Sequence, residues 1–151
     1  MGRRKKYESF SFEDLAKIIH GYLKEEGLSL NLSGYREVLK RYFHMHDNNL
    51  SEIYSLMIDC NLWSNYFAEL ESFLSLKKEE WMLKTDWLYA HENMAKPSEA
   101  LENRIQDAKQ HVRHYDMFIK HCHAQMNFFK KASEHCYNLY FKGLRGLIRS
   151  N

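Results

Sequence analysis

Residues 97–148 read PSEALENRIQDAKQHVRHYDMFIKHCHAQMNFFKKASEHCYNLYFKGLRGLI, and this stretch decides the fold. After Pro97 no proline or glycine occurs before Gly143. Residues recur in alternating steps of four and three, all apolar except one serine: Leu101, Ile105, Ala108, Val112, Tyr115, Ile119, Cys122, Met126, Phe129, Ser133, Cys136 and Tyr140. This spacing keeps one stripe of a helix turned toward a partner helix. We therefore expect a helix of about 75 Å that packs against a second long helix.

A second stretch without proline or glycine, from Leu50 to about Met94, supplies the partner. Its apolar stripe contains Ile53, Met57, Cys60, Phe67, Leu70, Leu74, Trp81 and Leu88. Four polar residues fall on the same stripe: Ser64, Glu71, Lys78 and Thr85. A helix of this length would run about 65–70 Å. The residue before a proline is disfavoured in a helix, so residues 95–98 are the expected turn of an antiparallel hairpin. The alternative is a compact monomer in which residues 50–94 bend into two helices.

The sequence predicts an all-α protein of three segments. Residues 1–9 form a basic flexible arm that contains Arg3, Arg4, Lys5 and Lys6. Residues 10–46 form two short helices, one from Ser11 to about Gly27 and one over residues 34–44, which pack on the hairpin. Short polar residues at 46–49 then interrupt the helical pattern. Residues 47–151 form the long hairpin.

Large aromatic residues lie beside both stripes, namely Trp63, Trp81, Trp87, Phe118, Phe128, Tyr137 and Phe141. Two short helices can cover roughly half of a long hairpin, so we expect a homo-oligomer with helices packed side by side. The expected oligomer contact lies at the C-terminal end, where Gly143 and Gly146 loosen the helix. It consists of Phe129, Tyr140, Leu144, Leu147 and Ile148.

The totals exclude several classes of protein. A net charge of +2 with mixed signs does not impose a strong field for nucleic acid. The odd number of cysteines, three, fits a reducing cytoplasm. No long apolar run and no secretion signal is present, so we expect a cytoplasmic protein without a membrane span.

Motifs of catalysis are absent, and we expect neither an enzyme nor a bound cofactor. No G-x-S-x-G, P-loop, Rossmann fingerprint or HExxH occurs. His111 and His114 share a helix face, but no third ligand lies at helical distance, so no metal site is expected. His44 and His46, two residues apart, point to different sides.

Cations interleaved with aromatic rings make residues 77–96 a candidate nucleic-acid site. Single-stranded nucleic acid is held by cations on its phosphates and by flat rings under its bases. The candidate cations and the histidine are Lys77, Lys78, Lys84, Lys96 and His91, and the candidate rings are Trp81, Trp87 and Tyr89. The alternative is a core stripe of tryptophans flanked by solvated lysines.

Several patches over roughly residues 60–148 resemble the T-even-type phage recombination mediators, the UvsY family. They are Leu62-Trp63-Ser64, Ser75-Leu76-Lys77-Lys78-Glu79, Lys142-Gly143-Leu144-Arg145-Gly146-Leu147, and the helix from Tyr115 to Cys122. The resemblance implies a ring-like oligomer that binds single-stranded DNA. It also implies help in loading a recombinase onto DNA covered by single-strand-binding protein. The family carries basic residues just before the turn, but residues 89–94 of this chain contain no lysine or arginine. The nearest candidates are Lys84, His91 and Lys96.

Two functions are therefore expected, in order. The first is a recombination mediator that binds single-stranded DNA and a recombinase. The alternative is a helical protein-interaction module, such as a phage inhibitor or assembly adaptor, that binds no nucleic acid.

Overall fold

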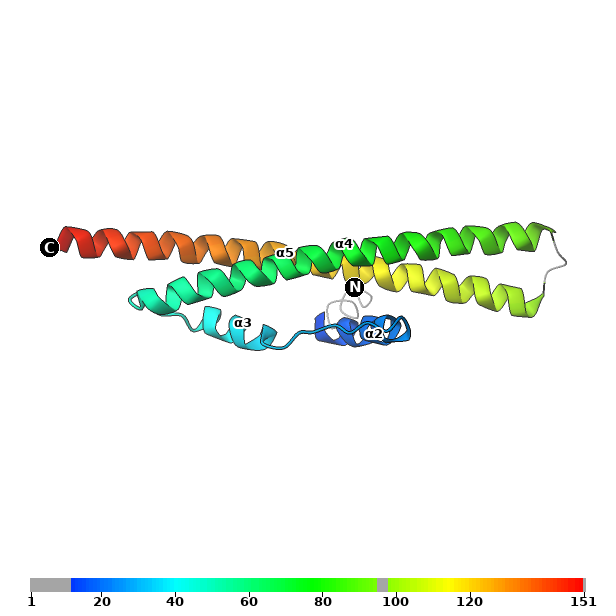
Figure 1. The fold of residues 1–151 in the computed structure, drawn as a ribbon, viewed down its shortest axis with the longest axis horizontal. Helices are drawn as coiled ribbons and strands as arrows, with labels where there is room; N and C mark the ends of the chain where they lie inside the picture. Colours follow the sequence, from blue (N-terminus) through cyan, green and yellow to red (C-terminus); the bar gives the residue numbers. More distant parts are fainter. Residues whose placement is uncertain (1–11, 95–97, 151) are drawn as a thin grey trace, which may run out of the picture. The chain divides into compact units, whose positions relative to one another are not determined.

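The computed structural model describes residues 12–94 and 98–150, and these residues form four helices and no strand. The helices are α2 (Phe12–Glu25), α3 (Tyr35–Phe43), α4 (Leu50–Met94) and α5 (Glu99–Ser150), as Figure 1 shows. The predicted all-α class is confirmed. The expected basic arm, the helix start at Ser11 and the turn at residues 95–97 lie outside the described residues.

The helix ends follow from local chemistry. Gly27 has a φ of 76°, and the N–H groups of Gly27 and Leu28 bond to the carbonyls of Lys24 and Leu23. This glycine-dependent arrangement satisfies the free carbonyls at the end of α2. At the start of α5, the Ser98 hydroxyl accepts a hydrogen bond from the N–H of Leu101 at 3.1 Å, as an N-cap does.

The two long helices have the predicted extent. α4 is continuous over 45 residues, so the alternative in which it bends into two helices is wrong. α5 is continuous over 52 residues and passes through Gly143 and Gly146. The expected loosening at these glycines is therefore also wrong, because the i to i−4 bonding of the helix needs no side chain.

Contacts divide the chain into two compact units, and each contains one short helix with parts of both long helices. The first unit consists of the chain up to Leu30 together with Glu71–His121. The second unit consists of Asn31–Leu70 together with the chain from Cys122.

In the first unit, α4 and α5 run antiparallel, because rising numbers on α4 meet falling numbers on α5. Lys78 bonds to Asp116 at 2.7 Å, and the Nζ of Lys109 lies 4.9 Å from the Tyr89 ring. Apolar residues of α2 are buried, and Phe12 stacks on Phe118 with ring centroids 5.6 Å apart. α2 therefore covers part of the aromatic surface beside the two predicted stripes.

In the second unit a short helix again packs an aromatic side chain against the long helices. Tyr35 of α3 packs edge-on against Trp63, Phe67 and Phe129 at 5.8 to 5.9 Å. Its hydroxyl donates a hydrogen bond to Gln125 at 2.6 Å. α3 is held further by charge, because Arg41 binds both Asp59 at 2.7 Å and Glu52 at 3.2 Å on α4.

Three hydroxyl residues on the predicted stripes, Ser64, Thr85 and Ser133, are accommodated by backbone carbonyls. The Ser64 hydroxyl donates to the Met126 carbonyl, and the Ser133 hydroxyl donates to the Met57 carbonyl, so both cross between the long helices. The Thr85 hydroxyl donates to the carbonyl of Trp81 on its own helix. Among the described residues, no buried side-chain nitrogen or oxygen lacks a hydrogen-bond partner. Every residue of the predicted α5 stripe is buried or half-buried, which confirms the stripe.

The cysteines behave as small apolar residues. Cys60, Cys122 and Cys136 are free and buried. Burial, with Cys136 nearby, raises the pKa of Cys60 to about 12, so this thiol stays protonated and unreactive. None of the described helices combines the length and apolarity that a membrane span requires.

Substitution of the two glycines of α5 by alanine should give opposite effects. At Gly146 a Cβ would meet nothing within 4 Å, so we expect Gly146→Ala to stabilise the protein by up to about 1 kcal/mol through helix propensity. At Gly143 a Cβ would collide with the Leu50 side chain, so Gly143→Ala should show no gain or a loss. Urea unfolding measures both, and an equal gain at the two positions would contradict the close packing of α4 and α5 at Leu50.

Acidification should weaken the attachment of α2. The Tyr22 hydroxyl bonds to Nδ1 of His114, and burial, His111 and Arg113 lower the pKa of His114. A histidine whose pKa is lower folded than unfolded contributes stability that is present above about pH 6.5 and is lost as pH falls. We expect the urea midpoint to drop between pH 7.5 and 5.5, and to drop less in His114→Gln. An equal drop in both proteins would show that His114 is not responsible.

Candidate nucleic-acid interface

Two of the predicted DNA-binding lysines are engaged within the chain. Lys77 pairs with Glu26 of α2 at 2.8 Å and with Glu80 at 3.1 Å, and the Glu26 contact is the main reason that its pKa is raised. Lys78 pairs with Asp116 at 2.7 Å and lowers the pKa of that carboxyl. Phosphate binding would have to break these pairs, so neither lysine offers a free charge.

The predicted stacking rings differ in their exposure to solvent. Trp81 is half-buried, with the His111 ring 3.8 Å from its ring and the Nζ of Lys84 4.3 Å away. Trp87 is 53% exposed and lies against His91 at 4.0 Å. Tyr89 is 38% exposed and lies under Lys109, while Lys96 lies outside the described residues. The structure therefore brings together some predicted residues, but Trp81 is already covered by protein groups.

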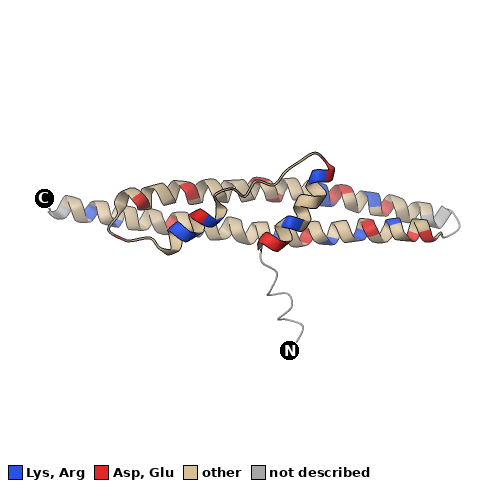
Figure 2. Ribbon diagram, turned by 90° about the horizontal axis from the view of Figure 1, so that it is seen from below, with Lys and Arg blue, Asp and Glu red and all other residues tan. Residues whose placement is uncertain are grey.

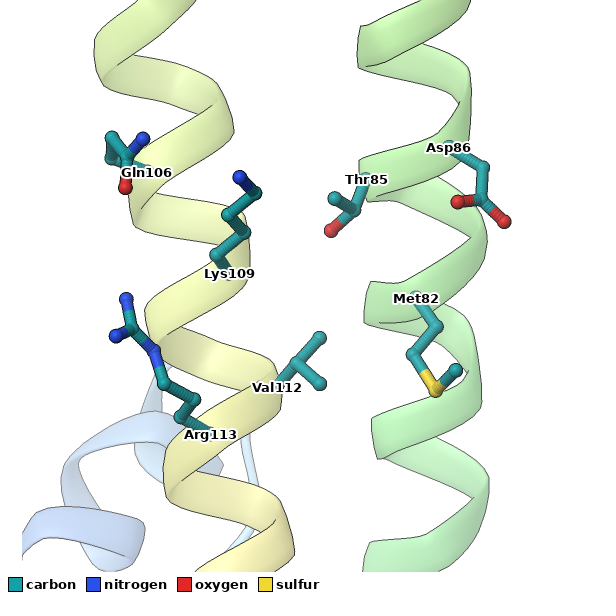
Figure 3. A pocket seen from close by; sticks show the side chains of 7 residues that line it. All are labelled: Met82, Thr85, Asp86, Gln106, Lys109, Val112 and Arg113. Atoms are coloured by element: carbon teal, nitrogen blue, oxygen red, sulfur yellow. The ribbon is translucent and has the colours of Figure 1, made fainter.

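A groove between α4 and α5 lies in the same unit. It has a volume of about 500 Å³ and is lined by Met82, Thr85, Asp86, Gln106, Lys109, Val112 and Arg113. Figure 3 shows Val112 pointing from α5 toward α4, with Lys109 and Arg113 on the α5 side. Asp86 lines the groove from α4 with its carboxylate turned away from α5, so the lining residues include both signs of charge and no aromatic ring.

Residues 71–121 and residues 122–150 differ in their ratio of basic to acidic residues. Residues 71–121 contain eight Lys or Arg against nine Asp or Glu, and Figure 2 shows both signs mixed on either side of the grey segment. Residues 122–150 contain five Lys or Arg, namely Lys130, Lys131, Lys142, Arg145 and Arg149, against Glu134 alone. Electrostatic attraction for phosphates is therefore expected along the second half of α5 and not at residues 77–91.

Exposed rings lie on that same half of α5. Tyr137 is 52% exposed and Phe141 is 37% exposed, and their ring centroids are 4.5 Å apart. Tyr140 connects Phe141 to Tyr54 of α4 at centroid distances of 5.7 and 5.3 Å. The second unit thus presents a cluster of four adjoining rings, of which Tyr54, Tyr137 and Phe141 are exposed to solvent.

Basic residues lie near these rings because their spacing in the sequence matches the helical repeat. Lys130 is seven residues before Tyr137, and Arg145 is four residues after Phe141, so each lies close to the face of the rings. Lys131 and Lys142 are eleven residues, or three turns, apart and form a parallel row beside them. All four are exposed and have no ion pair among the described residues. We name Lys130, Lys131, Tyr137, Phe141, Lys142 and Arg145 the basic-aromatic face of α5.

The predicted oligomer contact needs one correction. Phe129 is fully buried against Tyr35, Trp63 and Phe67 within its own chain, so it has no surface to offer another subunit. Tyr140 and Leu144 are half-buried. Leu147 and Ile148 are 56% and 74% exposed, so a contact at these two residues stays a prediction.

Two histidines of α5, His111 and His114, serve packing in the structure. His111 lies between Tyr22 at 4.2 Å and Trp81 at 3.8 Å, and its Nδ1 bonds to the Asp107 carbonyl at 2.8 Å. His114 bonds to the Tyr22 hydroxyl. Within the described part of the chain, no group of three metal-ligating side chains lies close enough to hold an ion.

Comparisons with protein-family models, with curated proteins and with solved structures find no match to this chain. The functional proposal therefore depends on the geometry of the basic-aromatic face. The sequence identified its rings, Tyr137 and Phe141, as uncovered aromatic residues but placed the candidate DNA site at residues 77–96. Plotting residues 130–145 on a helical wheel would have shown the shared face.

Substitution of two tryptophans should distinguish a packed ring from a free one. Trp81→Ala removes the ring that covers buried His111, so we expect a loss of roughly 2 kcal/mol in the free energy of unfolding. Trp87→Ala removes a ring that is half exposed and should cost well under 1 kcal/mol. Urea unfolding compares the two variants, and the reverse order would contradict the placement of these rings.

Proposed function

We propose that this protein binds single-stranded DNA along the basic-aromatic face of α5 and acts as a recombination mediator. The observation that carries the proposal is the arrangement of two exposed rings between Lys130 and Arg145, without an ion pair to neutralise those cations among the described residues. Rings offer stacking surfaces that accept any base, and the cations beside them neutralise phosphates.

The dimensions of the face support this proposal. With a rise of about 1.5 Å per residue, residues 130–145 extend over about 22 Å. Lys130 and Arg145 lie near the ends of the ring face, and Lys131 and Lys142 follow one edge of it. An extended strand could therefore place its phosphates along the cationic edge and its bases on the rings. Glu134 is the one acidic residue in residues 122–150, and it opposes such binding.

The mediator role comes from the resemblance of residues 60–148 to the UvsY family, which implies that a recombinase and a single-strand-binding protein are partners. A long helical pair can carry DNA on one face and keep other faces for proteins. Exposed α4 residues of the second unit provide such a face, because Tyr54, Ile58 and Leu62 follow each other at four-residue intervals and are 41 to 59% exposed.

A second candidate function is a protein-interaction module without nucleic acid. It is favoured by the same exposed α4 residues, since contiguous apolar surface marks protein-binding sites. An absence of oligonucleotide binding at low salt would leave this candidate as the better account.

Anisotropy of a labelled oligothymidine, titrated with the protein at 50 and 300 mM salt, tests the proposal. If four cations contact phosphates, log affinity should fall with log salt at a slope of about −3, which is roughly a 100-fold loss over this range. Lys130→Ala with Arg145→Ala should reduce that slope by about 1.4. Tyr137→Ala should weaken binding about tenfold or more, because one stacking ring is lost.

Three further variants serve as controls. Glu134→Gln should tighten binding, because it removes the opposing charge. Lys77→Ala and Lys84→Ala should leave binding nearly unchanged, since Lys77 is paired and Lys84 lies in a region of balanced charge. Loss of binding in these two variants but not at Lys130 and Arg145 would overturn the assignment of the site. No binding at 50 mM salt would overturn DNA binding itself.

A further inference from the structure

The first unit exposes a second apolar stripe on α4, on the side away from α5. The inner stripe is buried at Leu74, Thr85 and Leu88. On the opposite side, Leu76 is 54% exposed and Leu83 is 69% exposed. A helix that carries apolar residues on opposite sides is typical of a helix covered on both sides.

The outer stripe has the spacing of a coiled coil. Its residues recur in steps of three and four from Phe73, in the order Phe73, Leu76, Glu80, Leu83, Trp87 and Ala90. With Phe73 at position a of a heptad, these residues occupy successive a and d positions. Leucine therefore occupies both d positions before Ala90, at Leu76 and Leu83.

The flanks of this stripe carry opposite charges. The e positions, one residue after each d, are Lys77, Lys84 and His91. The g positions, one residue before each a, are Ser72, Glu79 and Asp86. One edge of the stripe is thus basic and the other is acidic, and residues at e and g determine partner and orientation in coiled coils.

Charge complementarity selects the partner and its direction. In a parallel pair, each g residue faces the e residue that lies five positions later in the other helix. Glu79 would then face the partner's Lys84, and Asp86 would face the partner's His91. In an antiparallel pair of the same stripe, g would face g, and the acidic edges would repel each other. We propose that α4 pairs in parallel with α4 of a second copy of this chain through residues 72–91.

The central d position and one facing charge pair of this contact are available, whereas Lys77 is already bound to Glu26. Glu79, Leu83 and Lys84 are exposed, and the two charged residues have no ion pair among the described residues. Glu80, at an a position, is partly neutralised by Lys77 at 3.1 Å. A polar residue at one a position reduces stability but fixes the register of the two helices. The contact uses none of the residues of the basic-aromatic face, so it does not depend on DNA binding.

Mass measured by light scattering on the full chain tests the pairing. The wild type should have a mass of at least twice 18.2 kDa, and Leu83→Glu should shift it toward the monomer by raising the dissociation constant at least about tenfold. Met82→Glu is the matched control, because Met82 is an exposed neighbour at position c and should leave the mass unchanged. A monomeric wild type at about 100 µM would overturn the proposal.

Charge exchange and cross-linking test the direction of pairing. Glu79→Lys and Lys84→Glu should each weaken association, and the double exchange should restore it, because the facing charges are again opposite. Under oxidising conditions Leu83→Cys should form a disulfide between copies, since equal d positions adjoin in a parallel pair, and Met82→Cys should not. Failure of the double exchange to restore association, or equal cross-linking at both positions, would contradict parallel pairing.

Discussion

The antiparallel contact between α4 and α5 is the interaction on which the rest of the structure depends. Between α4 and α5, the described residues make no backbone–backbone hydrogen bond, so every contact of the pairing involves side chains. Its stripe is mostly apolar, and the hydroxyls of Ser64 and Ser133 reach carbonyls of the facing helix. These bonds allow polar residues in the seam, because no buried side-chain polar atom among the described residues is left unsatisfied. Because this contact stripe fixes the rotation of each helix, it also determines which residues the other faces present.

Two long helices expose more apolar surface than they bury against each other. In the first unit α2 covers Phe118, and in the second unit α3 inserts Tyr35 among Trp63, Phe67 and Phe129. Other rings stay exposed, among them Trp87, Tyr137 and Phe141. Their surroundings differ in charge, because residues 71–121 are balanced and residues 122–150 are basic. This difference supports DNA on the face of α5 and a second copy of the chain on α4.

The sequence predicted much of the fold because its signals are periodic and long. The α5 stripe, the continuous α4 and the helix end at Gly27 all follow from residue spacing and backbone preference. The candidate site was less predictable, because side-chain pairing across helices decides which groups are free. The engagement of Lys77 by Glu26 and of Lys78 by Asp116 joins residues 51 and 38 positions apart. The burial of Phe129 depends likewise on Tyr35 of α3, which no spacing within α5 indicates.

Ultraviolet cross-linking of the full chain to oligothymidine, with the adducts located by mass spectrometry, tests the central claim most directly. Bases stacked on protein rings form adducts with those rings or with their close neighbours. We predict adducts in the peptide that contains Tyr137 and Phe141. Adducts confined to Trp87 or Tyr89, or no adduct under conditions where the oligonucleotide binds, would contradict the assignment of DNA to α5.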